Sequence, residues 1–446
     1  MRDLKLNFVT NTQTIAMDKS LSPLYNYLNA YDSKNSSHYF LLRYVFDQKI
    51  YYYGNNFKHP HERRIKKSEL FKIKLLGKLY EFFVFFNAKF NSSSNDKIKI
   101  WSTAYFKLEE KIDDEKYHVF NPPWVFSRRR DIAYNYELHK KIKEIKHVIV
   151  YGNFNELVNE NFFRKIDELK QSLKNHVLKE NIRAVLLPHD LGFFERLVIQ
   201  IFKEIGRPSF LLIHGLPGIY GKMDNNRTDF LVVWGEAIKR NYIDVGFDPG
   251  KILVNGHPKY KINSDISLTF ELNNILVLPK PLGGAPAGDK YELNDRGNCI
   301  LYLLSVQSVL KKIGISKVRF RPHPSENPNW YMTYLDRDFF TPDTDTLENS
   351  LSKSSLVIGV TSTVFLESLI NGVSYLVYEP RLENGNGLDN NPVVAPFDGS
   401  NIKVPVAKSE DELLELIKQK SKVDLSILSD YIDPDFDAKI ILEKIK

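Results

Sequence analysis

Two short polar motifs follow predicted strands in the second half of the sequence. An apolar strand beginning at residue 318 leads into Arg-Pro-His-Pro at 321–324, and a strand at 356–360 leads into Thr-Ser-Thr at 361–363, where a helix is predicted to begin. The carboxyl ends of neighbouring parallel strands lie at one edge of a sheet, so both motifs would reach the same spot. An imidazole, a guanidinium, hydroxyls and helix N–H groups together suit a phosphate. The spacing therefore predicts a nucleotide site.

His323 is the residue we expect to handle the leaving nucleotide. It stands between Pro322 and Pro324, whose rings fix φ and keep the loop from becoming helical. A donating imidazole there would hold a phosphate, although a loop histidine packed against its neighbours is the alternative. Arg321 would pair with a phosphate or with the carboxylate of an acidic sugar, unless it forms an ordinary surface ion pair.

Three hydroxyl residues, Thr361, Ser362 and Thr363, precede the predicted helix 364–370. One of them would suffice as a helix cap, so three in succession favour a bound phosphate as well. One turn later, Glu367 would accept hydrogen bonds from ribose hydroxyls; a surface carboxylate near a helix N-terminus is the alternative.

The loop that follows the predicted strand 275–278 holds further candidates for donor binding, Lys280 and Gly283. Prolines and glycines from 279 to 288 would allow close backbone approach to a nucleotide. The loop lacks the spacing of a phosphate loop or a dinucleotide fingerprint, however, and an ordinary loop is the favoured interpretation.

These motifs depend on an alternation of strands and helices that is clear after Lys146, whereas residues 30–125 give mixed signals. The predicted strands of the first half are 147–151, 184–188, 209–213, 230–234 and 252–254, with helices at 161–178, 192–205 and 236–245. The predicted strands of the second half are 275–278, 317–321, 356–360 and 375–378, with closing helices at 413–417 and 438–445. This rhythm predicts an α/β protein with doubly wound parallel sheets.

A polar break at 259–274 separates the two halves and predicts two domains, 1–265 and 266–425, followed by a terminal helix at 426–446 that packs back on the first domain. The chain of 446 residues exceeds what one core usually serves. A single cysteine excludes a disulfide framework and predicts a reducing compartment. The charged and polar start predicts no secretory signal. The most apolar stretch, 79–90, is too short to span a membrane.

The net charge of +7 is mild for this length, but basic residues cluster beside aromatics at 58–67 and 128–130. Solvated surface is the favoured interpretation, and a surface for anionic lipid headgroups or a charged glycan is the alternative. No nucleic-acid-binding pattern accompanies the charge, so we expect no nucleic acid partner.

The residues around both motifs resemble those of GT-B glycosyltransferases. Residues 361–377, with Glu367 before Asn-Gly-Val at 371–373, are similar to the nucleotide-binding element of that fold. The pairs His-Pro at 323–324 and Ser-Thr at 362–363 are similar to motifs of bacterial sialyltransferases and of Kdo and polysialic acid transferases, which use CMP-activated sugars. The segments 214–218 and 234–258 resemble the N-terminal domain of capsule transferases, including the CDP-glycerol type.

The resemblance implies a GT-B fold whose first domain binds the acceptor and whose second binds the nucleotide sugar across a cleft. It implies a carboxylate base in the first domain, and Asp190 in Asp-Leu-Gly partly matches the expected acidic motif, with Glu195 as substitute. A helix cap is the alternative for Asp190. His214, Gly215 and His257 follow strands of the first domain and would face the acceptor or the cleft.

Neither a metal nor another cofactor is required by these motifs. Residues 343–345 read Asp-Thr-Asp but lie in a loop rich in Pro and Thr, so a cation site is disfavoured.

The leading hypothesis is a metal-independent glycosyltransferase that moves an acidic sugar of the sialic, pseudaminic, legionaminic or Kdo kind from a CMP donor to a bacterial surface glycan or lipid-linked glycan. Asp190 would be the base, and His323, Ser362 and Thr363 would stabilise the leaving phosphate. A UDP-sugar or CDP-glycerol-type transferase of the same fold, or a non-catalytic scaffold for polysaccharide assembly, are the alternatives. We expect a cytoplasmic protein with peripheral contact to the inner membrane.

Overall fold

The computed structural model describes residues 37–54, 79, 97–125, 135–221, 227–263, 265–280, 297–324, 326 and 328–445. The predictions made for Gly283 and for the basic clusters at 58–67 and 128–130 lie outside these residues.

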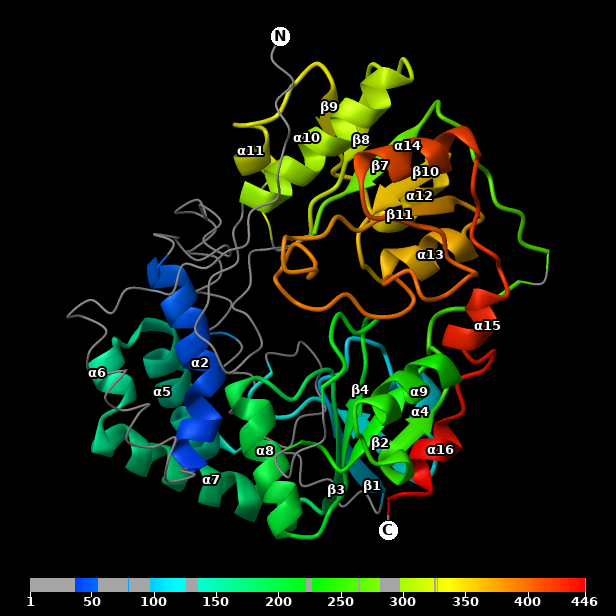
Figure 1. Ribbon diagram of the computed structural model, residues 1–446. Helices are drawn as coiled ribbons and strands as arrows, with labels where there is room; N and C mark the ends of the chain where they lie inside the picture. The colour runs from blue at the N-terminus through cyan, green and yellow to red at the C-terminus, as the bar shows by residue number, and fades with distance from the viewer. Residues whose placement is uncertain are drawn as a thin grey trace.

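Two six-stranded sheets form the framework, and every strand pair within them is parallel (Figure 1). The first sheet has the order β2-β1-β3-β4-β5-β6, formed by Tyr117–Phe120, Ile98–Ser102, Ile182–Leu187, Ser209–Leu212, Phe230–Val233 and Ile252–Val254. The second has the order β12-β11-β10-β7-β8-β9, formed by Val406–Ala407, Ser374–Tyr378, Leu356–Gly359, Ile275–Leu278, Val318–Phe320 and Phe340–Pro342. The predicted fold class, α/β with two Rossmann-like domains built on doubly wound parallel sheets, is confirmed.

Helices cover the sheets, and this explains why the central strands read as continuous apolar runs. The helices of the first domain are α2 (Ser37–Gly54), α4 (Glu109–Ile112), α5 (Tyr136–Tyr151), α6 (Phe154–Leu157), α7 (Glu160–Lys179), α8 (Phe193–Glu204) and α9 (Glu236–Asp244), with a 3-10 turn at Pro249–Lys251. Those that follow β7 are α10 (Gly297–Lys312), α11 (Pro328–Tyr331), α12 (Leu347–Ser352), α13 (Val364–Ile370), α14 (Glu410–Lys418), α15 (Ile427–Tyr431) and α16 (Ala438–Leu442). Among the described residues, no helix has the length and apolar character needed to cross a membrane.

The predicted strand at 147–151 is wrong, because these residues are the last turn of α5. Asn135 caps the helix by accepting a bond from the Leu138 amide, and Leu138, Ile142 and Ile145 form its buried stripe. That stripe has helical spacing and starts well before the run of β-branched residues that suggested a strand. Val150 is 58% exposed, as expected for the outer face of a helix and not for a central strand.

The ambiguous region at 30–125 supplies the edge of the first sheet as well as α2. Strand β1 pairs with β3, so it occupies an interior position although the chain places it before α5 and α7. Trp101 on β1 is fully buried and packs edge-on against Trp124 with ring centroids 5.4 Å apart.

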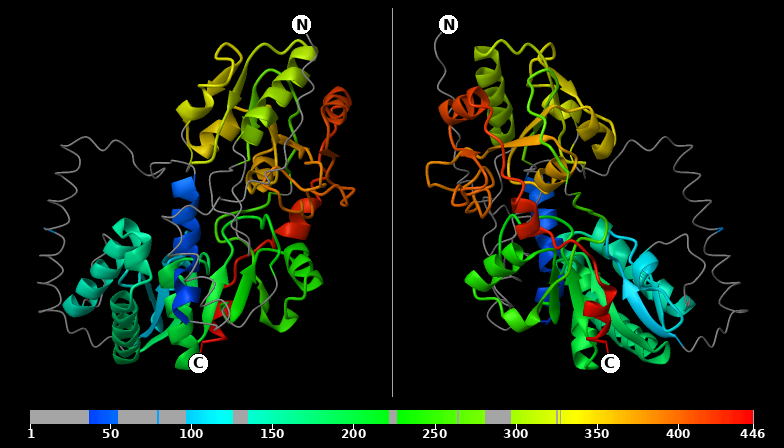
Figure 2. Two further views of the ribbon diagram at one scale, coloured as in Figure 1. Left: turned by 60° about the vertical axis from the view of Figure 1, so that its left-hand side comes forward. Right: turned by 90° about the vertical axis from the view of Figure 1, so that its right-hand side faces the viewer.

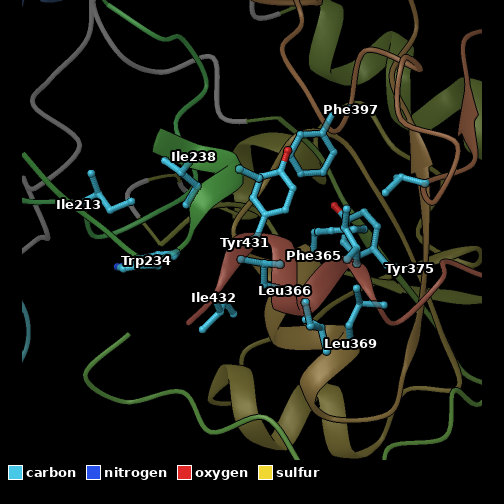
Figure 3. Packing of buried hydrophobic residues seen from close by; sticks show 14 of the residues in the cluster. Ile213, Trp234, Ile238, Phe365, Leu366, Leu369, Tyr375, Phe397, Tyr431 and Ile432 are labelled. Carbon is cyan, nitrogen blue, oxygen red and sulfur yellow. The ribbon is translucent and has the colours of Figure 1, made fainter. Parts of the chain in front are cut away.

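The two domains share one hydrophobic cluster (Figure 3). Ile213 and Trp234 from the first domain, Phe365 and Tyr375 from the second, and Tyr431 of α15 all belong to it. Burial of each such side chain contributes roughly 2 kcal/mol or more, so the cluster gives the domains a substantial common interface.

The C-terminal segment runs from the second domain back along the first, in red in Figure 2. α16 contributes Ile441 to the core beneath β1, β2 and β4. Gly256 passes so close to this segment that a Cβ atom would lie 2.5 Å from the Asp435 carbonyl oxygen. The predicted domain limits at 265 and 425 stay a proposal; the first falls between β6 and β7.

Candidate functional site

Each sheet reverses its strand order at one point, and open parallel sheets bind ligands beside such points. In the second sheet the reversal lies between β7 and β10, whose ends lead to Lys280 and Thr361. In the first sheet it lies between β1 and β3, which lead to Tyr105 and Asp190. The candidate residues therefore lie where this topology places ligands.

The carboxyl edges of the two sheets meet at the loop after β4. The Leu216 amide donates to the Thr363 hydroxyl over 2.9 Å, across 147 residues of sequence. Gly215 is required for this approach, because a Cβ atom there would lie 2.7 Å from the Thr363 oxygen. Thr363 is the residue before α13, yet its hydroxyl does not cap that helix. Instead it joins the two domains.

Two of the predicted phosphate-binding residues, His323 and Arg321, have different surroundings after β8. His323 has exposed surface, and the protein packed around its ring lowers its pKa, which favours the neutral imidazole. Arg321 donates to the Asp343 carboxylate over 3.1 Å and to the Asp345 carbonyl oxygen over 2.6 Å. The guanidinium is thus held by the loop after β9 rather than aimed at solvent. Pro324 is exposed beside His323.

Thr361 and Lys280 are joined through a buried carboxylate that the sequence analysis missed. Glu379, at the end of β11, has no exposed surface, and it accepts from the Thr361 amide over 2.6 Å and from its hydroxyl over 3.0 Å. Lys280 lies 3.5 Å from Glu379 and 3.1 Å from Asp389, and these carboxylates raise the pKa of Lys280 against the effect of burial. Of the three hydroxyls, Ser362 accepts from the Val364 amide at the start of α13.

Glu367 bonds to the segment between the domains. Its carboxylate accepts from the Tyr260 hydroxyl over 2.8 Å, and burial raises the pKa of Glu367. Tyr260 stacks on His257 with ring centroids 3.5 Å apart. His257 Nδ1 accepts from the amides of Lys259 and Tyr260, and burial lowers the pKa of His257 to about 3. His257 is therefore a neutral structural residue of this joint.

His214 has the geometry of a general base. Its Nδ1 donates to the Pro188 carbonyl oxygen over 2.9 Å, which fixes the tautomer and leaves Nε2 as an acceptor. The ring keeps exposed surface, and the protein around it lowers the pKa of His214, so the neutral form predominates at pH 7. Tyr105, which is 65% exposed, packs edge-on against this ring at 4.8 Å.

Asp190 is 8% exposed and paired with Arg227, whose Nε donates to it over 2.7 Å. The predicted substitute, Glu195, lies in the first turn of α8 and is half-buried. Gly192 packs against it so closely that a Cβ atom would lie 2.1 Å from a Glu195 carboxylate oxygen. Asp190 is not the cap of α8, because Gly192 occupies the N-cap position.

The residues that sequence reasoning missed share a property: Tyr105, Arg227, Tyr260 and Glu379 act through partners far away in the chain. Only Glu379 carried a local signal, since it follows a predicted strand directly.

Within the described ranges, no three His, Cys, Asp or Glu side chains gather where they could hold a metal ion. Asp343 of the Asp-Thr-Asp sequence is 8% exposed and bonds to both Arg319 and Arg321.

No family model and no curated protein matches the chain. Solved structures similar to it include UDP-GlcNAc 2-epimerase from Neisseria meningitidis, at 13% identity and a TM-score of 0.41 over 78% of this chain and 98% of that one. Another is UDP-N-acetylglucosamine 2-epimerase from Rickettsia bellii, at 14% identity and 0.40 over 78% and 96%. The apo lipopolysaccharide outer core galactosyltransferase WaaB has 10% identity and 0.42 over 78% and 99%. Likenesses this distant say nothing about the activity of this chain.

Proposed function

We propose that this chain is a glycosyltransferase that uses a nucleotide-activated sugar as donor. The observation that carries the proposal is the bond between Leu216 and Thr363, because it joins the carboxyl edges of two parallel sheets. His214 of the first domain then borders the hydroxyl motif of the second. A base opposite a phosphate-binding motif is what transfer to an acceptor hydroxyl requires.

In the proposed reaction the acceptor hydroxyl gives its proton to His214 Nε2 while its oxygen forms a bond to the anomeric carbon of the donor sugar. The bond from that carbon to the phosphate oxygen breaks, and the electron pair leaves with the nucleotide. His323, as a neutral imidazole, donates its N–H to the leaving phosphate, and Ser362 adds a hydroxyl donor. Asp190 stays a candidate base, but its pairing with Arg227 supports His214 for the role.

Two hypotheses concern the identity of the donor. The CMP-linked acidic sugar was predicted from sequence, with a UDP-sugar or CDP-glycerol as the alternative. At the reversal between β7 and β10, Lys280 lies between the carboxylates of Glu379 and Asp389. Both carboxylates already have cationic partners, because Lys280 lies against each of them and Arg381 interacts with Glu379 as well. The charges at this point therefore do not separate the two hypotheses, and the binding test compares UDP, CDP and CMP.

Binding of the nucleotide is tested first, by thermal unfolding with UDP, CDP and CMP. A ligand that binds only the folded chain raises its unfolding temperature. Transfer is then measured with the corresponding sugar donors and a glycan or lipid-linked acceptor, at the membrane surface and in solution. His214→Asn should lower kcat by roughly 10²- to 10⁴-fold, the range for loss of a general base. His118→Asn, on the far edge strand β2, is the matched control. Equal turnover in both variants would contradict the proposal, and release of free sugar without transfer would indicate a hydrolase or epimerase instead.

A further inference from the structure

The segment from 255 to 260, here called the joint, contacts three parts of the chain at once. Asn255 exchanges two hydrogen bonds with Asp437 of the C-terminal segment, of 2.9 and 2.8 Å. His257 contacts Trp234 and Phe106 edge-on, with centroids 4.6 and 4.7 Å apart, so it is fixed to the strand ends of the first domain. Tyr260 connects the joint to α13 by a hydrogen bond to Glu367.

The Tyr260 ring is held in one position by its contacts. It lies flat on His257, at an interplanar angle of 12°, and its backbone amide donates to His257 Nδ1 over 2.9 Å. The hydroxyl at the end of this ring donates to Glu367 Oε1 over 2.8 Å, across 107 residues of sequence. A rigid aromatic group of the first domain thus fixes the direction of a carboxylate in the second.

We propose that Tyr260 is a positioning residue that holds Glu367 ready for the ribose of the nucleotide, and thereby couples nucleotide binding to the joint between the domains. The inference rests on the proposed function. Tyr260 occupies Oε1, and among the described residues no hydrogen-bond donor of the protein reaches Oε2. A carboxylate held through one oxygen presents the other in a fixed direction, which suits a ribose hydroxyl.

The bond also affects the pH at which Glu367 ionises. Burial raises the pKa of Glu367, whereas the Tyr260 bond and the charges of Lys259 and Arg321 lower it. The nearby His257 adds no charge, because burial keeps it neutral down to about pH 3. Removal of the Tyr260 hydroxyl should therefore raise the pKa of Glu367 further, because one of the interactions that oppose the effect of burial is lost. The carboxylate should then take up its proton at a higher pH, and the protonated form accepts ribose hydrogen bonds less well.

The test is nucleotide affinity of the full chain, measured by calorimetry between pH 5 and 8 with UDP, CDP and CMP. Tyr260→Phe should weaken binding about tenfold at neutral pH, as expected for a lost hydrogen bond to a charged group. The acid limb of its pH profile, meaning the loss of nucleotide affinity as the pH falls, should move to higher pH. Glu367→Gln should bind weakly with no such limb. Tyr378→Phe is the matched control, because that buried hydroxyl bonds to Ser305 in a different part of the core.

Unchanged affinity and an unchanged acid limb in Tyr260→Phe would overturn the inference while leaving the proposed function standing. An affinity loss of equal size at every pH would also overturn it, since that is the result of a merely structural role. If the wild-type chain bound none of the three nucleotides, the proposed function itself would fail.

Discussion

Disruption of the pair formed by Asp190 and Arg227 tests whether Asp190 has a structural or a catalytic role. The carboxylate is 8% exposed and the guanidinium side chain 21%, with 2.7 Å between Asp190 Oδ2 and Arg227 Nε. Removal of one partner from a buried pair costs about 3–5 kcal/mol, because the other charge remains buried without compensation. Arg227 keeps some exposure, so we expect about 3 kcal/mol for Arg227→Ala and less for Asp190→Asn, which can still accept a bond.

Chemical denaturation of both single variants and the double variant measures this pair directly. We expect a coupling free energy of about 1–3 kcal/mol, the range for residues in contact. Asp430→Asn is the control, since its pair with Lys403 is about a third exposed on both sides and should contribute less than about 1 kcal/mol. Transfer by Asp190→Asn should stay within about tenfold of wild type. Unchanged stability together with abolished transfer would refute this reasoning and make Asp190 the base.

Three further perturbations test other contacts of the candidate site. Gly215→Ala places a Cβ atom 2.7 Å from the Thr363 oxygen, so it should break the bond between the domains and cost about 1–3 kcal/mol in unfolding free energy; wild-type stability would contradict the close approach. Tyr105→Ala removes a 65% exposed ring beside His214 and should raise the KM for a glycan acceptor several-fold without changing nucleotide affinity, whereas equal effects on both would exclude an acceptor role. The protein around His214 lowers its pKa below the usual 6.5, so His214 is neutral and able to act as a base at neutral pH. We therefore expect kcat/KM to fall only when the pH drops through this lowered pKa. A midpoint above 6.5 that disappears in His214→Asn would contradict this ionisation.

The sequence predicted the strands that lead to the site with little error because each is a short apolar run between turn residues. The strand 275–278 has the same limits in the structure, and the helix 364–370 is α13. The strand β1 escaped prediction because its five residues, Ile-Lys-Ile-Trp-Ser, resemble many other segments of that region. In α5 the run of β-branched residues at 148–150 favours a strand locally, although the helical stripe that begins at Leu138 continues through it.

The site was predicted less completely than the fold because its important bonds join distant residues. Local pattern placed Glu367 on the correct helix and Thr363 before it, and nothing near them in the sequence indicates Tyr260 or Leu216 as partners. Arg321 shows the same limit: its position after a strand suggested a phosphate ligand, but Asp343 in the loop after β9 holds its guanidinium.

Calorimetric titration of the full chain with UDP, CDP and CMP, repeated with His323→Ala, measures whether the chain binds a nucleotide through His323. We predict that the wild-type chain binds at least one of these nucleotides and that the variant, folded to the same stability, binds it at least about tenfold more weakly, as expected for loss of a hydrogen bond to a charged phosphate. Binding of none of them by the wild-type chain, or equal affinity in the variant, would contradict it.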